Sequence, residues 1–126
     1  MSYTYSFEKL ETWKAARALV KWIYGVTKNF PLDEKYGLVL QLRRSAISVV
    51  SNIAEGSARN SPKDKAHFYQ VAYSSVIEIL NQLIVSNDLN FISDATLVEG
   101  RAVTQSLTLR LYYLRKAELG KLSQTF

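Results

Sequence analysis

Apolar residues recur every three or four positions along most of the chain, which is the period of an amphipathic helix rather than a strand. Short polar breaks divide this pattern into four segments. We expect helices over about residues 10–29, 33–55, 62–88 and 94–118, followed by a frayed tail. Because the linkers are about five residues long, successive helices should pack side by side in opposite directions. The pattern therefore predicts one all-α domain, residues 1–126, folded as an antiparallel up-down-up-down four-helix bundle.

Capping and breaking residues set the predicted helix ends. The first helix should end ahead of Pro31, because the residue before a proline disfavours the helical backbone. Gly56 is placed to close the C-terminus of the second helix. Ser61 and Pro62 are suited to the N-cap and the first position of the third helix, and Ser93 is a cap for the fourth. Capping and helix-breaking residues therefore mark each predicted loop, in addition to the interruption of the apolar periodicity.

The second and third expected helices are apolar over a wide face. On a helical wheel their apolar residues sweep roughly 200°, whereas a helix in an isolated bundle needs about 100–140°. Surplus apolar surface is either covered by a partner or left as an aggregation-prone patch, and we expect a homo-oligomer. The polar side of the second helix holds mostly small residues, so another backbone could approach closely, with Asn52 and Glu55 as hydrogen-bonding points. A serine-rich face exposed to water explains this polar side equally well.

Composition places the chain among folded proteins. Its 126 residues are 48% hydrophobic and 21% charged, which argues against disorder. The absence of cysteine excludes disulfides and thiolate metal sites. The sequence has no apolar run of the roughly 20 residues that a membrane span requires. The first residues, MSYTYSFEKLE, lack the pattern of a secretory signal. We therefore expect a cytoplasmic protein without a membrane partner.

The positive charge is unevenly distributed along the chain. Residues 1–63 carry ten of the 16 lysines and arginines but five of the 11 acidic residues, whereas residues 64–126 carry six of each. The whole net charge of +5 therefore lies in the first half, as a one-sided basic surface would require. A charged face that only aids solubility is the alternative interpretation.

One face of the first helix gathers cations at spacings of three, four and seven residues. They lie within a sector of roughly 60° on the helical wheel. The residues are Lys14, Arg17, Lys21 and Lys28. Trp13 and Tyr24 border this row, and a cationic row beside aromatic rings could follow a phosphate backbone and stack unpaired bases. An ordinary solvated face, with both rings packed into the bundle, would show the same spacing.

Three further arginines follow in the first half of the chain. Arg43 projects into the apolar arc of the second helix, so we expect a buried or interfacial pairing with a carboxylate such as Glu55 or Glu78. Arg59 lies in the loop ahead of the third helix and is freer to meet phosphate. Arg44 and Arg59 therefore join the candidate nucleic-acid-binding residues.

The residues that an enzyme would need are missing. The single histidine, His67, stands three residues after Asp64, as in one half of a di-iron helix motif, but such a site requires two pairs. The sequence has no serine elbow, glycine-rich phosphate loop or cysteine nucleophile. We expect no catalytic residue, no metal and no cofactor.

Three stretches of the sequence carry a resemblance to a known family. They are FEKLETWKAA from Phe7, FPLDEKYGLVLQLRRSAISVVSNIAEG from Phe30, and FYQVAYSSVIEI from Phe68. Residues 7–118 resemble the four-helix-bundle proteins encoded within intervening sequences of bacterial 23S ribosomal RNA genes. The most specific part is the asparagine-isoleucine-alanine-glutamate-glycine run at 52–56, preceded by glutamine and paired basic residues at 41–44.

The resemblance implies a fold, an assembly and a class of partner. It implies an antiparallel four-helix bundle that forms a ring-shaped homopentamer, with Asn52, Glu55, Gly56 and Arg43 as a structural motif. A related branch is the accessory variability protein of diversity-generating retroelements, a basic pentameric barrel that binds nucleic acid and the reverse transcriptase. The old label of ribosomal protein implies association with RNA.

Two hypotheses of different classes follow. The first is a non-enzymatic oligomeric protein that binds nucleic acid through repeated basic rows, with RNA favoured over DNA and ribosomal RNA as one candidate. The second is a protein-interaction scaffold whose ring docks another polypeptide.

Overall fold

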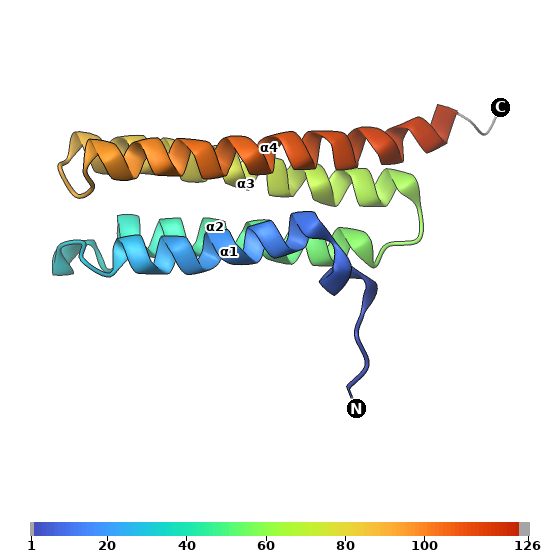
Figure 1. Cartoon of the computed structure of the whole chain (residues 1–126), viewed down its shortest axis with the longest axis horizontal. Coiled ribbons are helices and arrows are strands. Elements are labelled where there is room, and N and C mark those ends of the chain that lie inside the picture. Colours follow the sequence, from blue (N-terminus) through green and yellow to red (C-terminus); the bar gives the residue numbers. More distant parts are fainter. Residues whose placement is uncertain (1, 124–126) are drawn as a thin grey trace.

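The computed structural model describes residues 2–123, which form four α-helices and two short 3-10 turns, with no strand among them (Figure 1). The helices are α1 (Glu11–Thr27), α2 (Leu38–Ser57), α3 (Pro62–Asp88) and α4 (Asp94–Ser123), and the turns are η1 (Ser6–Lys9) and η2 (Leu32–Glu34). The prediction of an all-α chain with four helices is confirmed.

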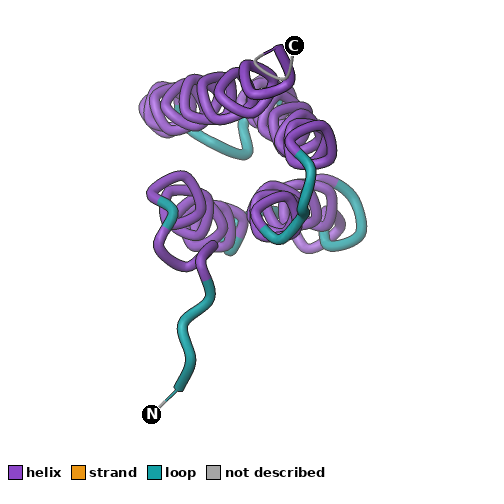
Figure 2. The backbone as a smooth tube through the Cα atoms, turned by 90° about the vertical axis from the view of Figure 1, so that its right-hand side faces the viewer, coloured by secondary structure: helices purple, strands orange, loops and turns teal. Residues whose placement is uncertain are grey.

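The four helices lie side by side, and the chain reverses direction at each of the three loops (Figure 1). In the end-on view, α1 and α2 form one layer and α3 and α4 the other (Figure 2). Contact is extensive between α2 and α3 and between α3 and α4, and sparse between α1 and α4. The first and last helices are therefore the loosest pair of neighbours.

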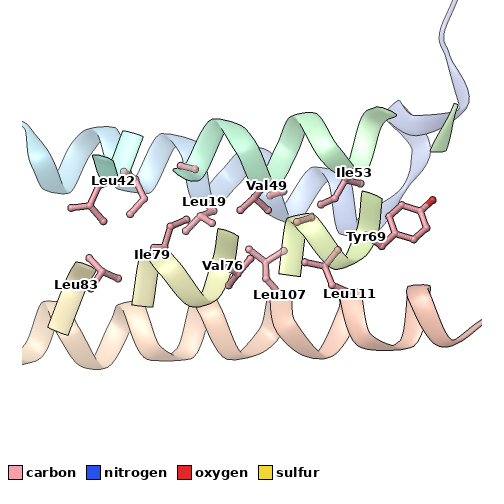
Figure 3. Packing of buried hydrophobic residues seen from close by; sticks show 14 of the residues in the cluster. Leu19, Leu42, Val49, Ile53, Tyr69, Val76, Ile79, Leu83, Leu107 and Leu111 are labelled. Atoms are coloured by element: carbon pink, nitrogen blue, oxygen red, sulfur yellow. The ribbon is translucent and has the colours of Figure 1, made fainter. Parts of the chain in front are cut away.

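Aliphatic side chains from all four helices meet between the two layers (Figure 3). Those that are fully buried or nearly so include Leu19, Leu42, Val49, Ile53, Val76, Ile79, Leu83, Leu107 and Leu111. Burying one such side chain contributes about 1.5–3 kcal/mol relative to leaving it exposed. This shared core fixes which face of each helix is left for solvent or for a partner.

The polar side of α2 lies partly against α3 of the same chain. Ser45 donates to Glu78 over 3.2 Å, and the hydroxyls of Ser48 and Ser75 are 2.8 Å apart. The Asn52 side chain donates to the Ser48 carbonyl at 2.8 Å. The close approach expected from the small residues thus occurs within one chain.

Gly56 does not close α2, contrary to the sequence prediction. The helix continues to Ser57 and ends where the Ala58 N–H donates to the Ala54 carbonyl. Gly56 is buried, and a Cβ at this position would lie 2.8 Å from Tyr69 Cε1 and 2.9 Å from Phe68 Cβ. The glycine is therefore explained by the close approach of α3, not by a helix end.

Two helix bounds differ from those predicted. The second helix begins at Leu38 rather than near residue 33, because Leu32–Glu34 form the turn η2 and a Glu34 carboxylate oxygen accepts from the Leu38 N–H at 3.1 Å. The fourth helix runs to Ser123, past the predicted end at 118, and Glu118 and Lys121 pair at 2.9 Å on its last turns. Residues 124–126 of the predicted tail lie outside the described residues.

The observed starts of α3 and α4 agree closely with those predicted from their cap residues. Ser61 accepts from the Asp64 N–H at 3.1 Å with Pro62 as the first helical residue of α3. Ser93 accepts from the Thr96 N–H at 3.1 Å ahead of α4.

A long-range hydrogen bond between described residues bridges the boundary between α1 and α4. Trp22 donates from its indole nitrogen to a carboxylate oxygen of Glu99 at 3.0 Å. Elsewhere along this boundary small side chains, including Ala15, Ala18 and Ala102, line an open hollow of about 360 Å³. Small residues here leave space that larger side chains fill between the other helix pairs.

Candidate nucleic-acid interface

The basic row of α1 lies on the side of the helix that faces away from the core. Its four cations, Lys14, Arg17, Lys21 and Lys28, are all exposed. The buried residues of α1 occupy the opposite face of the helical wheel. At 1.5 Å per residue the row extends about 21 Å along the helix. The residues are thus accessible and aligned, as phosphate contacts would require.

Two members of the row have partners. Lys14 pairs with Glu11 at 3.4 Å. Exposed pairs of this kind contribute about 0–1 kcal/mol, so this one leaves Lys14 available. The Arg17 guanidinium lies 4.9 Å from the centroid of the half-buried Trp13 ring, which in turn packs edge-on against Phe7. Trp13 is therefore largely a packing residue, as the solvated-face interpretation supposed.

Lys21 and Lys28 form no ion pair with any residue in the range 2–123. No described carboxylate neutralises their charges. Both lysines are therefore available for contact with an anion.

Arg43 pairs with no carboxylate of residues 2–123, so the prediction of a buried pairing within the chain is wrong, and a pairing across a subunit interface stays a prediction. Its Nε donates to Thr27 Oγ1 at 3.0 Å, and its guanidinium lies 4.4 Å from the centroid of the Tyr24 ring. Glu78 accepts from Ser45 instead. Arg43 faces α1, whereas Glu78 belongs to α3 on the other side of α2. The apolar arc of α2 borders two helices, and the wheel alone does not say which of them a given residue meets.

A hollow of about 390 Å³ opens beside Arg43, and we call it the Arg43 hollow. It is lined by Tyr24, Leu40, Arg43, Arg44 and Ile47. A smaller hollow of about 130 Å³ adjoins it, shares Arg43, and includes Lys28 and Lys35 in its lining. No carboxylate lines either hollow. Two predicted binding cations, Lys28 and Arg44, thus lie in adjoining hollows that share Arg43, and Arg44 lies in the one lined by the Tyr24 ring.

Lys35 was missed by the sequence analysis. It lies in the turn between η2 and α2, where helical periodicity carries no information, and its amino group lies 5.5 Å from the Tyr36 ring centroid. The sequence analysis assigned this position to the start of the second helix, where Lys35 gave no separate signal.

Arg59 lies apart from this cluster. It follows α2, sixteen residues after Arg43, which corresponds to about 24 Å along a helix. Its guanidinium lies 4.5 Å from the centroid of the Phe68 ring on α3. Arg59 therefore does not contribute to the Arg43 hollow.

The residues of the 52–56 run have different surroundings. Asn52 bonds to its own helix beside α3, and Gly56 allows α3 to approach. Glu55 is exposed and has no salt bridge among the described residues. Asn52 and Gly56 thus have structural contacts, whereas Glu55 is free to meet another molecule.

A buried tyrosine and carboxylate lie between α3 and α4. Burial raises the pKa of Tyr69, and the nearby negative charge of Glu118 raises that pKa further. Glu118 Oε2 is buried without a hydrogen-bond partner. The Tyr69 hydroxyl therefore stays protonated at neutral pH and adds no charge to the surface.

The outer face of α4 is apolar and uncovered. Val98, Leu109 and Tyr113 are 67%, 52% and 62% exposed, and Ala95 and Ala102 are also exposed. The core is formed by the opposite side of the helix, which includes Leu107 and Leu111. This face, defined by Ala95, Val98, Ala102, Leu109 and Tyr113, is called the outer α4 face below.

The comparisons place the chain in a family. None of the helices within residues 2–123 combines the length and the apolar content needed to cross a bilayer. No curated protein matches the sequence. The family model described as 23S rRNA-intervening sequence protein matches residues 8–113, which is most of the chain and includes the basic row and the 52–56 run. The chain therefore belongs to the family of 23S rRNA-intervening sequence proteins.

Proposed function

We propose that this protein is a non-enzymatic, cytoplasmic, RNA-binding protein whose antiparallel four-helix bundle assembles into a ring-shaped homo-oligomer. One observation carries the proposal. Arg43 and Arg44 line one hollow with Tyr24, and Lys28 lines the adjoining hollow with Arg43; neither hollow is lined by a carboxylate, and both lie at the end of the exposed row on α1. Unneutralised cations beside an aromatic ring are the chemistry that phosphates and bases require.

Assembly would multiply a weak interaction. Each subunit carries the same row, so a ring presents several rows to one RNA molecule, and linked contacts raise the overall affinity well above that of one subunit. The outer α4 face supports assembly, because its exposed valine, leucine and tyrosine side chains are stabilised when a second copy removes them from water.

The binding part of the proposal is tested by charge reversal in the row. Lys14→Glu, Arg17→Glu and Lys21→Glu together should weaken binding to a structured RNA about a hundredfold or more at roughly 0.1 M salt. The slope of log affinity against log salt should fall by about three, since three phosphate contacts are lost. Fluorescence anisotropy across a salt series measures both quantities.

A matched control carries the same charge change elsewhere. Arg101→Glu, Arg110→Glu and Lys116→Glu reverse three exposed cations of α4 and should weaken binding far less. If the two triple variants lose affinity equally, the row has no special role. If the row variant is folded and still binds RNA as the natural protein does, the function is disproved.

A second candidate function, a scaffold that docks another polypeptide, is favoured by the outer α4 face. Co-purification from the native host with and without nuclease separates the two functions. A polypeptide retained after nuclease and lost in a Val98→Lys variant supports the scaffold, whereas bound material that disappears with nuclease supports RNA binding.

A further inference from the structure

We infer that the Arg43 hollow binds a single unpaired nucleotide, so that the protein recognises single-stranded segments of RNA rather than duplex. The inference rests on the proposed RNA binding and narrows it to one kind of RNA. The base would lie against Arg43 and the apolar side chains of the hollow, and its phosphates would meet Arg44 and the lysines of the adjoining hollow.

The Arg43 side chain is held in place before any nucleotide arrives. Its Nε donates to Thr27 Oγ1 at 3.0 Å, and Thr27, which is 2% exposed, donates in turn to the Ile23 carbonyl at 2.7 Å. The guanidinium also lies over the Tyr24 ring at 4.4 Å. A planar cation fixed in this way loses little conformational freedom on binding, which favours recognition of a flat partner.

The lining of the hollow suits a base more than a bare anion. Leu40 and Ile47 supply apolar surface, and Ile47 is 43% exposed in the chain. The hollow is open to solvent and has a volume of about 390 Å³. Unpaired bases stack on guanidinium planes and aromatic rings, whereas a base in a duplex has both faces covered by its neighbours. An isolated phosphate would leave the apolar wall unused.

The charges around the hollow match the backbone of such a nucleotide. Arg44 is exposed at the rim, and Lys28 and Lys35 line the hollow that shares Arg43. None of these three cations forms a salt bridge with a described residue. Positive charge on two sides of an apolar wall is the arrangement expected for a base that lies between two phosphates.

The test compares three labelled RNA probes of twelve nucleotides: an unstructured oligoadenylate, a fully paired duplex, and a strand whose bases are replaced by abasic sites. The natural protein should bind oligoadenylate about tenfold more tightly than the abasic strand, because stacking supplies the difference. Arg43→Lys keeps the charge but removes the plane, so it should abolish this preference. Arg110→Lys makes the same exchange on α4, outside both hollows, and is the matched control that should keep the preference within about twofold.

A second variant covers the case in which Arg43→Lys unfolds the protein. Ile47→Ser lies on the exposed wall of the hollow, removes apolar surface without placing a charge beside Arg43, and should also reduce the preference for oligoadenylate. Circular dichroism and thermal unfolding verify that each variant is folded.

The outcomes separate this inference from the proposed function. If all three probes bind equally with a steep salt dependence, or if folded Arg43→Lys keeps the full preference, the hollow does not bind a base, although RNA binding stands. If neither these probes nor structured RNA binds, the proposed function itself is disproved and the inference falls with it.

Discussion

The apolar residues of α2 and α4 relate differently to the core. On α2 they sweep a wide arc, and most of that arc is used, because α2 packs against α1 on one side and against α3 on the other. On α4 the apolar residues are spread around the helix, and only one side of it is buried. The wide apolar arc of α2 thus reflects two neighbouring helices within the chain. Exposed apolar side chains are concentrated instead on α4, which the helical-wheel analysis did not identify.

The largest expected difference is in stability. Leu42→Ala removes a fully buried side chain of α2 and should lower the free energy of unfolding by about 3 kcal/mol, through lost burial and the cavity left behind. Leu109→Ala on the outer α4 face should change the stability of a single subunit by less than about 0.5 kcal/mol. Urea unfolding at low protein concentration measures both values. Equal losses would mean that the outer face is covered within the chain.

The next prediction concerns assembly. Val98→Lys with Leu109→Lys places two charges on the outer α4 face and should weaken self-association about a hundredfold, which corresponds to about 2.7 kcal/mol. Analytical ultracentrifugation over a range of concentrations follows this change. Ile77→Lys on α3, where the side chain is 45% exposed, is the comparison variant and should have a smaller effect. A natural protein that stays monomeric at high concentration contradicts the proposed ring.

Glycines on the two helices give a smaller contrast. Gly56→Ala on α2 brings a Cβ against the Phe68 Cβ, close to the α3 backbone, and should cost about 1 kcal/mol after the gain in helix propensity. Gly100→Ala on α4 meets the end of the Leu83 side chain and the rim of the Trp22 ring, which can move, so its cost should be lower. Gly25→Ala has open space around it and should stabilise the protein. Thermal unfolding ranks the three variants, and a stabilised Gly56→Ala would refute the close contact.

The smallest expected effect depends on pH. The pKa of Tyr69 is raised in the folded protein, so its contribution to stability is complete below the unfolded pKa near 10.0 and is lost as pH rises through the folded value. Stability should therefore fall as pH rises above about 10. Tyr69→Phe should remove part of that fall, by less than about 1 kcal/mol, in urea unfolding measured between pH 8 and 11. A pH profile identical in both proteins would show that other groups cause the fall.

The sequence predicted features that depend on local chemistry. The starts of α3 and α4 follow from Ser61, Pro62 and Ser93, because a cap acts on the residues next to it. Features that depend on tertiary contacts were predicted poorly. Gly56 resembled a helix end but accommodates α3, and Arg43 faces Thr27 rather than a carboxylate, because the wheel does not specify which helix lies opposite.

The candidate site was predictable only in part. The row on α1 was found because its spacing places it on one face, and the structure leaves all four cations exposed. The cluster around Tyr24 depends on how α1 packs against α2, and Lys35 joins it from a turn without periodicity. The periodicity of a single helix could not have predicted that these residues lie close together.

The hydrogen bond from Trp22 to Glu99 gives the loosest pair of helices an optical reporter. Should α1 and α4 part, the indole would lose its carboxylate partner and become hydrated, and its emission would shift to longer wavelength. The other tryptophan, Trp13, packs edge-on against Phe7 and lies beside the Arg17 guanidinium near the start of α1, so it would report local fraying instead. With Trp13 replaced by phenylalanine, the intrinsic fluorescence of the protein would follow the opening of this one boundary.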